Sequence, residues 1–334
     1  MGMIVFLLLF IIACGGGSDD KAPYTQADLT GTWVFHALGA GTTPRWLIFT
    51  ATIDSSGHGT SSSCLDSIGT CSYVVQLPID ANGVISGSNI HMTMTSNKNF
   101  IAGTAMEGSG EYELWIIQKA VPGTVYSNAD LQNKSFVFHQ LKVGSSNGWH
   151  YGEGTTDATG LMTTSSITTE SGPDTPGTVG TLSVDSTGAV TQDTDTSFHG
   201  FLAADKKTII ATNATGSSYN LMIYQITGQT YPAGPIPAGT SAAHLLACGV
   251  SPAPFWLHFT STVAGSGVIT FSDWVDSNGG SAPAGSHHGL ISPSGTVTIT
   301  EMPTYHGQVS DDGKFTVATQ TNATGVYSLQ VNTH

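Results

Sequence analysis

The chain has 334 residues and a formal net charge of −14, and Arg45 is its single arginine. A surface that binds nucleic acid or an anionic membrane needs clustered Lys and Arg, so this composition excludes both functions. Glycine is abundant, at 41 residues, and only 10% of residues are charged. β-branched and aromatic runs alternate with Gly, Asp and Asn, without long amphipathic helical segments, and this pattern predicts an all-β protein.

The chain begins with an apolar run over residues 3–13, which is shorter than the ~20 residues needed to span a bilayer. The run ends in Ile11-Ile12-Ala13-Cys14, which resembles a bacterial lipobox. The resemblance implies that residues 1–14 are a lipoprotein signal peptide whose Cys14 carries the lipid. Residues 15–22, GGGSDDKA, would then be a flexible tether. No Lys or Arg precedes the run, so an ordinary signal peptide cut nearby is the alternative.

An apolar residue followed by histidine recurs six times in the rest of the chain, each time at the start of a strand-turn-strand unit. The histidines are separated by 55, 48, 60, 45 and 62 residues, so short and long gaps alternate. This alternation predicts three double repeats of about 105 residues. The six positions are His36, His91, His139, His199, His244 and His306.

The joints between the double repeats also resemble one another. Residues 24–29 are YTQADL, residues 126–131 are YSNADL, and a weaker copy begins at Tyr231. These joints divide the folded part, residues 23–334, into repeats of roughly 24–125, 126–230 and 231–334. D-x-x-G sequences, such as Asp54–Gly57, predict hairpin turns because Asp bonds its downstream backbone and Gly adopts positive φ.

Each unit contains about four predicted strands, which is the size of a propeller blade. The sequence therefore predicts a six-bladed β-propeller built from three double-blade repeats. Only 28 residues follow His306, so Pro23–Phe35 is expected to complete the last blade and remove the exposed sheet edges. The alternative is three tandem small β-barrels or sandwiches, because about 105 residues suit a small β domain.

Three cysteines follow the N-terminal segment. Cys64 and Cys71 flank the turn-forming sequence LDSIGT and are predicted to form a disulfide in an oxidising compartment. Cys248 lies in the apolar segment HLLACGV and is predicted to be buried and unreactive. No Cys/His zinc spacing occurs, and the His287-His288 pair is expected to lie in a solvated loop.

The repeated histidines have two interpretations. In the first, each is a packed residue that bonds a neighbouring backbone carbonyl, as buried polar groups usually do. In the second, they form a channel ring that binds a divalent metal, with His199 and His306 as the better ligands. We favour the first, and we predict no metal site and no cofactor. A tryptophan recurs in each odd unit and is expected in the core, with an aromatic ligand face as the alternative: Trp46, Trp149 and Trp256.

Common catalytic motifs are absent, including the nucleophile elbow, the P-loop and H-E-x-x-H. A glycosidase needs two opposed carboxylates, and the repeat pattern pairs none of the candidates. Residues 310–315 resemble the Asp box of sialidases, but they lack its terminal Trp, and one arginine cannot supply the three that the family uses. A sialidase is therefore excluded. The candidate carboxylates are Glu111, Glu113, Glu153 and Glu301.

These observations predict a lipid-anchored, non-enzymatic binding scaffold of the bacterial cell envelope. Gly15 lacks the Asp that retains enteric lipoproteins in the inner membrane, so the resemblance implies anchoring in the outer membrane, on its periplasmic or outer side. The expected ligand is an unidentified protein or glycan. A carbohydrate-active hydrolase or lyase and a structural envelope protein are the alternatives, and an enzyme should gather its carboxylates at one mouth of the fold.

Overall fold

A computed structural model describes residues 23–334 except 68, 109, 229, 232, 252 and 283–285. The predicted signal peptide, Cys14 and the tether lie outside the described residues. Within them the protein is all-β, as the sequence predicted, with two short 3-10 helices, η1 (Gln26–Leu29) and η2 (Asn128–Asp130). Among the described residues, no helix has the length and apolar character needed to cross a membrane.

The strands form three separate antiparallel sheets, one in each repeat. The first contains β1 (Gly31–Ala40), β2 (Arg45–Ile53), β3 (His58–Asp66), β4 (Gly69–Thr70), β5 (Val74–Gln76), β6 (Val84–Ser86), β7 (Ile90–Met94), β8 (Phe100–Gly108) and β9 (Glu111–Ala120). The second contains β10 (Ser135–Gly144), β11 (Gly148–Thr156), β12 (Leu161–Thr169), β13 (Gly172–Asp174), β14 (Thr178–Val184), β15 (Ala189–Gln192), β16 (Asp195–Leu202), β17 (Thr208–Thr215) and β18 (Ser218–Thr227). The third contains β19 (Gly234–Pro235), β20 (Gly239–Gly249), β21 (Phe255–Val263), β22 (Val268–Asp276), β23 (His287–Ile291), β24 (Thr296–Ile299), β25 (Met302–Val309), β26 (Phe315–Ala323) and β27 (Val326–Thr333).

Each sheet rolls into a barrel. In the second repeat, eight strands close through the β11–β12 pairing, and β13 adds a hairpin strand outside the ring. In the third, eight strands close through β23–β24, and β19 pairs with the outside of β23. In the first, no ladder among the described residues pairs β5 with β6, and an isolated bridge joins Ile79, just after β5, to Ile85 of β6. An eight-stranded barrel has an interior that side chains just fill, or that holds one small ligand.

The predicted propeller is therefore wrong, and the alternative of three tandem barrels is confirmed. The two units of a repeat do not form separate blades, because β1 pairs with β9 from Thr32–Ala120 to Ala40–Tyr112. The N-terminal segment does not complete a last blade either, since β27 pairs with β20 and β26 of its own repeat. Four strands per unit suit either fold, and only the pairing of the first strand with the last distinguishes them.

The predicted D-x-x-G turns set the geometry of the hairpins. At the β2–β3 turn, the Asp54 side chain accepts hydrogen bonds from the backbone N–H groups of Ser56 and His58, at 2.8 and 3.1 Å. Gly57 has a φ of +82°, a conformation that L side chains rarely adopt. The turn of the second repeat repeats this arrangement at Asp157 and Gly160, where φ is +87°.

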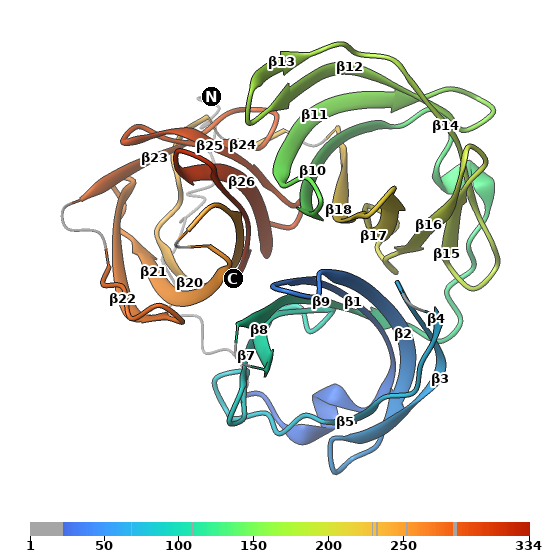
Figure 1. Cartoon of the computed structure of the whole chain (residues 1–334), viewed down its shortest axis with the longest axis horizontal. Helices are drawn as coiled ribbons and strands as arrows, with labels where there is room; N and C mark the ends of the chain where they lie inside the picture. The colour runs from blue at the N-terminus through green and yellow to red at the C-terminus, as the bar shows by residue number, and fades with distance from the viewer. Residues whose placement is uncertain are drawn as a thin grey trace, which may run out of the picture.

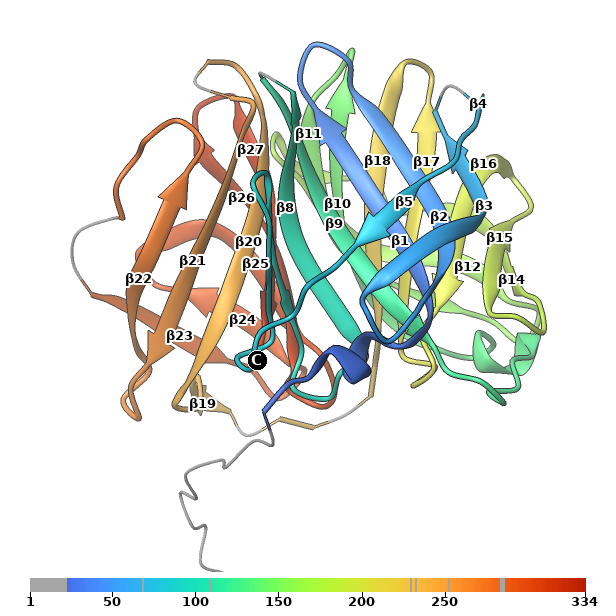
Figure 2. The same ribbon diagram turned by 90° about the horizontal axis from the view of Figure 1, so that it is seen from below.

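The three barrels stand side by side around a common axis (Figures 1 and 2). The strands nearest the axis are apolar on both faces, as the nearly continuous burial of β1 shows. Their outward faces meet in one central core to which all three repeats contribute, including Leu38, Leu141 and Leu246. Their inward faces fill the barrels, so each of these strands stabilises two cores at once.

Candidate functional site

The inward-facing positions of the first strands differ sharply between the repeats. When His36, His139 and His244 are aligned, β1, β10 and β20 stand in register. The side chains one and three residues before each histidine point into the barrels. The first and second repeats have large aromatic residues at two of these positions, and the third has small ones. The aligned sets are Trp33, Phe136 and Ser241, and Phe35, Phe138 and Ala243.

The last strand of each barrel shows the same change. Leu114, Leu221 and Leu329 occupy equivalent positions in the central core. The inward neighbours that follow them are apolar or aromatic in the first two repeats and are amides in the third. The aligned sets are Trp115, Met222 and Gln330, and Ile117, Tyr224 and Asn332.

These replacements leave the third barrel hollow. Its interior core is split into two clusters, one around Leu245 and Leu257 and the other around Ile299 and Val309. Two cavities of about 360 and 450 Å³ occupy the barrel. They share the wall residues Phe259, Phe271, Ile299, Tyr305 and Gln330, so they lie next to each other, and we call them the two lobes of the barrel interior. Volumes of this size are typical of sites for small molecules.

The lobes occupy opposite parts of the barrel. The first, lobe 1, is lined by Ser241 of β20 and Thr316 of β26, near the starts of those strands. The second, lobe 2, is lined by Leu245 and Gln320, which lie four residues further along the same strands. A strand rises ~3.3 Å per residue, so these two levels are separated by about 13 Å along the strands.

A few polar groups interrupt the apolar wall. The buried hydroxyls of Ser241 and Ser261 bond each other at 2.7 Å, and the Gln330 amide donates to Asn332 at 2.8 Å. Trp274 lines lobe 2, and its buried indole N–H has no hydrogen-bond partner among the described residues. A buried donor without a partner costs free energy.

The sequence placed His287 and His288 together in a solvated loop, and this expectation is wrong for His287. The pair begins β23, so the two side chains point to opposite faces. The His287 ring is buried in the third barrel, 5.1 Å from the ring of Phe271. The His288 ring is exposed, and its Nδ1 lies 2.7 Å from a carboxylate oxygen of Glu301.

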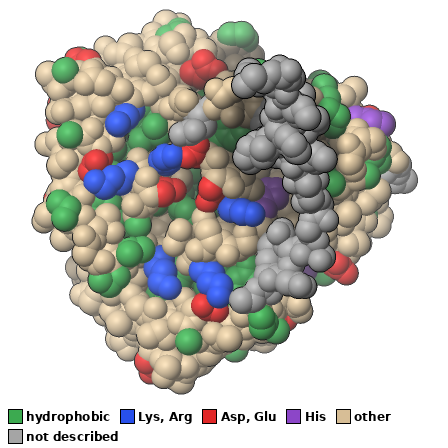
Figure 3. Space-filling model, turned by 180° about the vertical axis from the view of Figure 1, so that it is seen from behind, with side chains coloured by type: hydrophobic (Ala, Val, Ile, Leu, Met, Phe, Trp, Pro, Cys, Tyr) green, Lys and Arg blue, Asp and Glu red, His purple; other side chains and the backbone are tan. Residues whose placement is uncertain are grey.

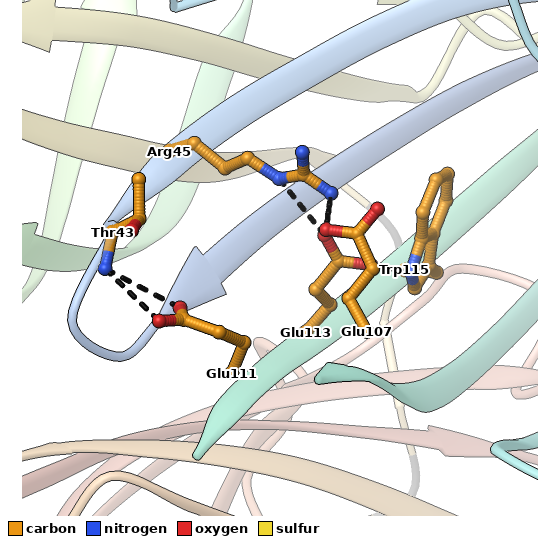
Figure 4. Close-up of polar contacts among 6 residues, drawn as sticks. All are labelled: Thr43, Arg45, Glu107, Glu111, Glu113 and Trp115. Atoms are coloured by element: carbon orange, nitrogen blue, oxygen red, sulfur yellow. Dashed lines mark hydrogen bonds and ion pairs between the residues drawn. The ribbon is translucent and has the colours of Figure 1, made fainter. Parts of the chain in front are cut away.

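The first barrel carries a cluster of charged groups instead (Figure 4). Arg45 lies between Glu107 and Glu113, and its Nε and Nη2 donate to Glu113 at 3.1 and 2.7 Å. Burial alone would lower the pKa of Arg45. Its hydrogen bonds to the two carboxylates outweigh this effect and raise the pKa above its usual value. Burial raises the pKa of Glu113, which also accepts from the Trp115 indole at 2.8 Å. A smaller hollow of about 240 Å³ lies beside this cluster.

The four carboxylates that the sequence offered for hydrolysis do not form an opposed pair. Glu111 accepts hydrogen bonds from the backbone N–H groups of Thr42 and Thr43, and Glu113 is held by Arg45. Glu153 lies on β11 of the second barrel, and Glu301 in the third. Within the described part of the chain, no group of three or more His, Cys, Asp or Glu residues is arranged to hold a metal ion.

The repeated histidines and tryptophans lie where the barrels contact one another. Each interface brings together a histidine and a tryptophan of one barrel and an even-unit histidine of the next. The Trp–His ring centroids are 5.1, 5.1 and 5.4 Å apart. The three sets are His36 and Trp46 with His199, His139 and Trp149 with His306, and His244 and Trp256 with His91.

The odd-unit histidines are fully buried and neutral. Burial lowers the pKa of His36, His139 and His244 to about 3, with a smaller contribution from neighbouring histidines. His139 donates from Nε2 to the carbonyl of His306 at 3.0 Å, and His244 Nε2 bonds the Thr93 hydroxyl at 2.8 Å. His36 packs without a hydrogen-bond partner among the described residues.

The interface between the third and first barrels has one more histidine than the others. His258 lies 4.3 Å from His91 and 6.1 Å from His244, measured between ring centroids. In each barrel one residue of the second strand pairs with the repeated histidine of the first strand. This residue is His258 in the third barrel, Tyr151 in the second and Ile48 in the first. Burial, and then the charge on His91, lowers the pKa of His258 to about 4. Alignment of the repeats could have found this residue, which the sequence analysis missed.

The cysteines lie in different environments. Cys64 and Cys71 are joined by a disulfide that links β3 to the segment leading into β5, with Cα atoms 5.1 Å apart. The Cys248 thiol is buried in the central core, and its sulfur donates to the backbone carbonyl of Lys142. Burial raises the pKa of Cys248 to about 12, so it stays protonated near neutral pH.

Comparison with known proteins gives only distant structural likenesses. No family model matches the sequence, and no curated protein matches it. A DUF3598-family protein from Nostoc punctiforme is 10% identical, with a TM-score of 0.21, over 60% of this chain and 97% of that one. Transferrin binding protein B from Neisseria meningitidis is 6% identical, with a TM-score of 0.27, over 93% and 77%. Kievitone hydratase from Nectria haematococca is 8% identical, with a TM-score of 0.16, over 95% of each chain.

Proposed function

We propose that this protein binds a small, predominantly apolar molecule inside the third barrel, while the other two barrels act as its scaffold. The observation that supports this most strongly is the two-lobed cavity at positions that large residues fill in the other repeats. Its apolar and aromatic wall, interrupted by polar side chains in both lobes, matches the usual composition of a small-molecule site. The proposal replaces the protein or glycan partner that the sequence analysis expected.

Binding without catalysis fits the chemistry of the cavity. Glu301 is the single carboxylate among the described residues that line the two lobes, and it is paired with His288. A hydrolase that uses two carboxylates has no partner for it there. The enzyme alternative therefore has no specific observation in its favour, and neither does a purely structural role.

The test is to fill the cavity with the residues of the second repeat. We expect the wild-type protein to bind the fluorescent apolar probe N-phenyl-1-naphthylamine saturably. The double variant Ser241→Phe/Ala243→Phe should bind it at least about tenfold more weakly, which corresponds to ~1.4 kcal/mol. Thr240→Phe is the matched control, because it adds the same side chain at an exposed position of β20.

Unchanged probe affinity in the folded double variant would contradict the proposal. Circular dichroism establishes whether each variant is folded, since adding volume to a core can strain it. Gln330→Met, which adds the residue of the second repeat without a large change in volume, provides an independent second variant. It should keep or strengthen probe binding, because it makes the wall of both lobes more apolar without filling them.

We also propose that the protein is anchored in the outer membrane through Cys14. The support is the lipobox resemblance of residues 11–14. Changing Cys14→Ser should move the protein from the membrane fraction to the soluble fraction of lysed cells. An unchanged membrane fraction would rule out the lipid anchor, and it would leave the binding proposal untouched.

A further inference from the structure

Two of the three barrel interfaces place a second ring against the even-unit histidine, beside the tryptophan. Between the second and third barrels, Tyr151 stacks on His306, with ring centroids 5.1 Å apart and planes inclined by 16°. Between the third and first barrels, His258 contacts His91 at 4.3 Å and 33°. In both places the histidine ring therefore contacts two rings of the neighbouring barrel.

The interface between the first and second barrels lacks the second ring. Ile48 occupies the position that Tyr151 and His258 have in their barrels. His199 keeps its contact with Trp46, at 5.1 Å and 39°, and the other two interfaces have almost the same geometry, at 44° and 39°. His199 is therefore placed as its counterparts are, but among the described residues it has one ring contact where they have two.

A hollow of about 400 Å³ lies at this interface. Ile48 of β2 lines it from the first barrel, and Ala189 of β15 and His199 of β16 line it from the second. Ala189 is the counterpart of Thr296, since each pairs with the second residue after the even-unit histidine. Thr296 interacts with the side chain of Tyr151. The hollow therefore lies where the Tyr151 ring lies at the next interface.

The lining of the hollow is uncharged. Burial lowers the pKa of His199, which is the one titratable side chain among the lining residues, so it is neutral at neutral pH. The lysine–aspartate ion pairs form between other segments, and Figure 3 shows lysine and acidic side chains gathered on one end of the molecule. The exposed hydroxyls of Ser63 and Thr191 border the hollow, beside its apolar wall. This lining suits an uncharged ring that carries a small polar group.

From these observations we infer that the hollow binds a small, uncharged aromatic molecule, whose ring stacks on His199 as Tyr151 stacks on His306. A volume of about 400 Å³ is within the range of small-molecule sites and exceeds what one side-chain ring needs, so we assign a free molecule rather than a partner's side chain. The inference goes beyond the proposed function, because this hollow lies between the first and second barrels and not inside the third.

The test compares p-cresol with 4-methylcyclohexanol, which have the same substituents and differ in whether the ring is aromatic. Nuclear magnetic resonance follows the imidazole C–H signals of His199, which are identified by their absence in His199→Gln. This readout reports on the hollow and not on the third barrel. We expect saturable shifts of these signals, and about fivefold tighter binding of p-cresol, a factor that corresponds to ~1 kcal/mol.

Ile48→Tyr supplies the missing ring from the chain itself, and it should weaken p-cresol binding at least about tenfold. Thr52→Tyr is the matched control, because it adds the same side chain at an exposed position of β2 outside the hollow, ~13 Å further along the strand. It should leave the affinity unchanged. Ala189→Phe is an independent second variant, which fills the hollow from an exposed position and should also weaken binding.

Three results would overturn the inference. The first is the absence of saturable His199 shifts with p-cresol, and the second is equal affinity for the two ligands. The third is an unchanged affinity for p-cresol in folded Ile48→Tyr and Ala189→Phe proteins. Each of these results would leave the proposed function of the third barrel standing, and failure of N-phenyl-1-naphthylamine to bind the third barrel would leave this inference standing.

Discussion

The second and third barrels close through the same order of eight strands, but the second is filled and the third is hollow. In the second, Phe136, Phe138 and Tyr224 are each less than a tenth exposed and pack into one interior cluster. In the third, Ser241 and Ala243 leave the interior divided between two clusters. The barrel backbone is therefore set by strand pairing and by the outward faces in the central core, and the interior is free to specialise.

The outward faces show the opposite behaviour. Leu141 and Leu246 keep their character between the repeats, and a tryptophan contacts a histidine of the next barrel at every interface. A substitution there would disturb two barrels at once, whereas a substitution inside one barrel disturbs only that barrel. This difference explains how one repeat can lose its interior aromatic residues without losing the assembly.

Acidification should have the largest effect, and it acts on the interfaces. His36, His139 and His244 have a pKa of about 3 in the folded protein, against ~6.5 in an unfolded chain. Below pH 6.5 the unfolded state binds more protons, so stability is complete above that pH and is lost as pH falls toward 3. Each histidine contributes a loss of up to ~1.4 kcal/mol per pH unit, which urea titrations at several pH values would measure.

His258 sharpens this prediction, because it is present only at the interface of the third barrel with the first. With a pKa of about 4, His258 is a fourth histidine whose pKa in the folded protein lies below its usual value. His258→Tyr, the residue of the second repeat, should move the midpoint of acid unfolding to lower pH. An acid midpoint that is unchanged or higher in a folded His258→Tyr protein would show that this cluster does not limit stability in acid.

Opening the second barrel should have the next largest effect. Phe136→Ser gives the second barrel the residue that the third has at this position, and it removes a side chain that is only 1% exposed. Loss of a buried aromatic side chain costs ~3–5 kcal/mol, so the urea midpoint should fall accordingly. A cost below ~1 kcal/mol would mean that the second barrel tolerates a cavity as the third does, and the contrast between them would fail.

Removal of the disulfide should have the smallest effect, and it concerns the first barrel. Between β5 and β6 this barrel closes through the isolated Ile79–Ile85 bridge, and among the described residues only this barrel has a disulfide. The double variant Cys64→Ser/Cys71→Ser should lose ~2 kcal/mol, because the closed loop is short. Peptide mapping without reductant checks the bond itself, and free thiols at both positions in exported protein would refute it.

The sequence was informative about the repeats and ambiguous about their closure. The spacing of His36, His139 and His244 located the three repeats, and the Asp54–Gly57 turn was predicted with its mechanism. Whether β1 pairs with β9 is a contact between residues some 80 positions apart, and no local pattern encodes it. The propeller and barrel hypotheses therefore predict the same strands, and the wrong one was favoured.

The candidate cavity was missed for a different reason. The cavity is marked by the absence of large residues in the third repeat, at Ser241, Ala243, Gln330 and Asn332. Motif searches look for residues that are present and therefore do not find it. Comparing the repeats position by position would have located the hollow barrel once the inward faces were known. Lobe 1 depends on the β25–β26 turn meeting β20 and β27, which only the folded arrangement shows.

The most direct test of the central claim is to locate a bound apolar molecule in the chain. A fatty acid with a photoactivatable diazirine on its alkyl chain would be bound to the wild-type protein, irradiated, and the labelled peptides identified by mass spectrometry. We predict labels on the peptides that contain Phe259, Phe271 or Tyr305, and loss of those labels in Ser241→Phe/Ala243→Phe. Labels confined to the first or second barrel, or unaffected by the double variant, would contradict the account.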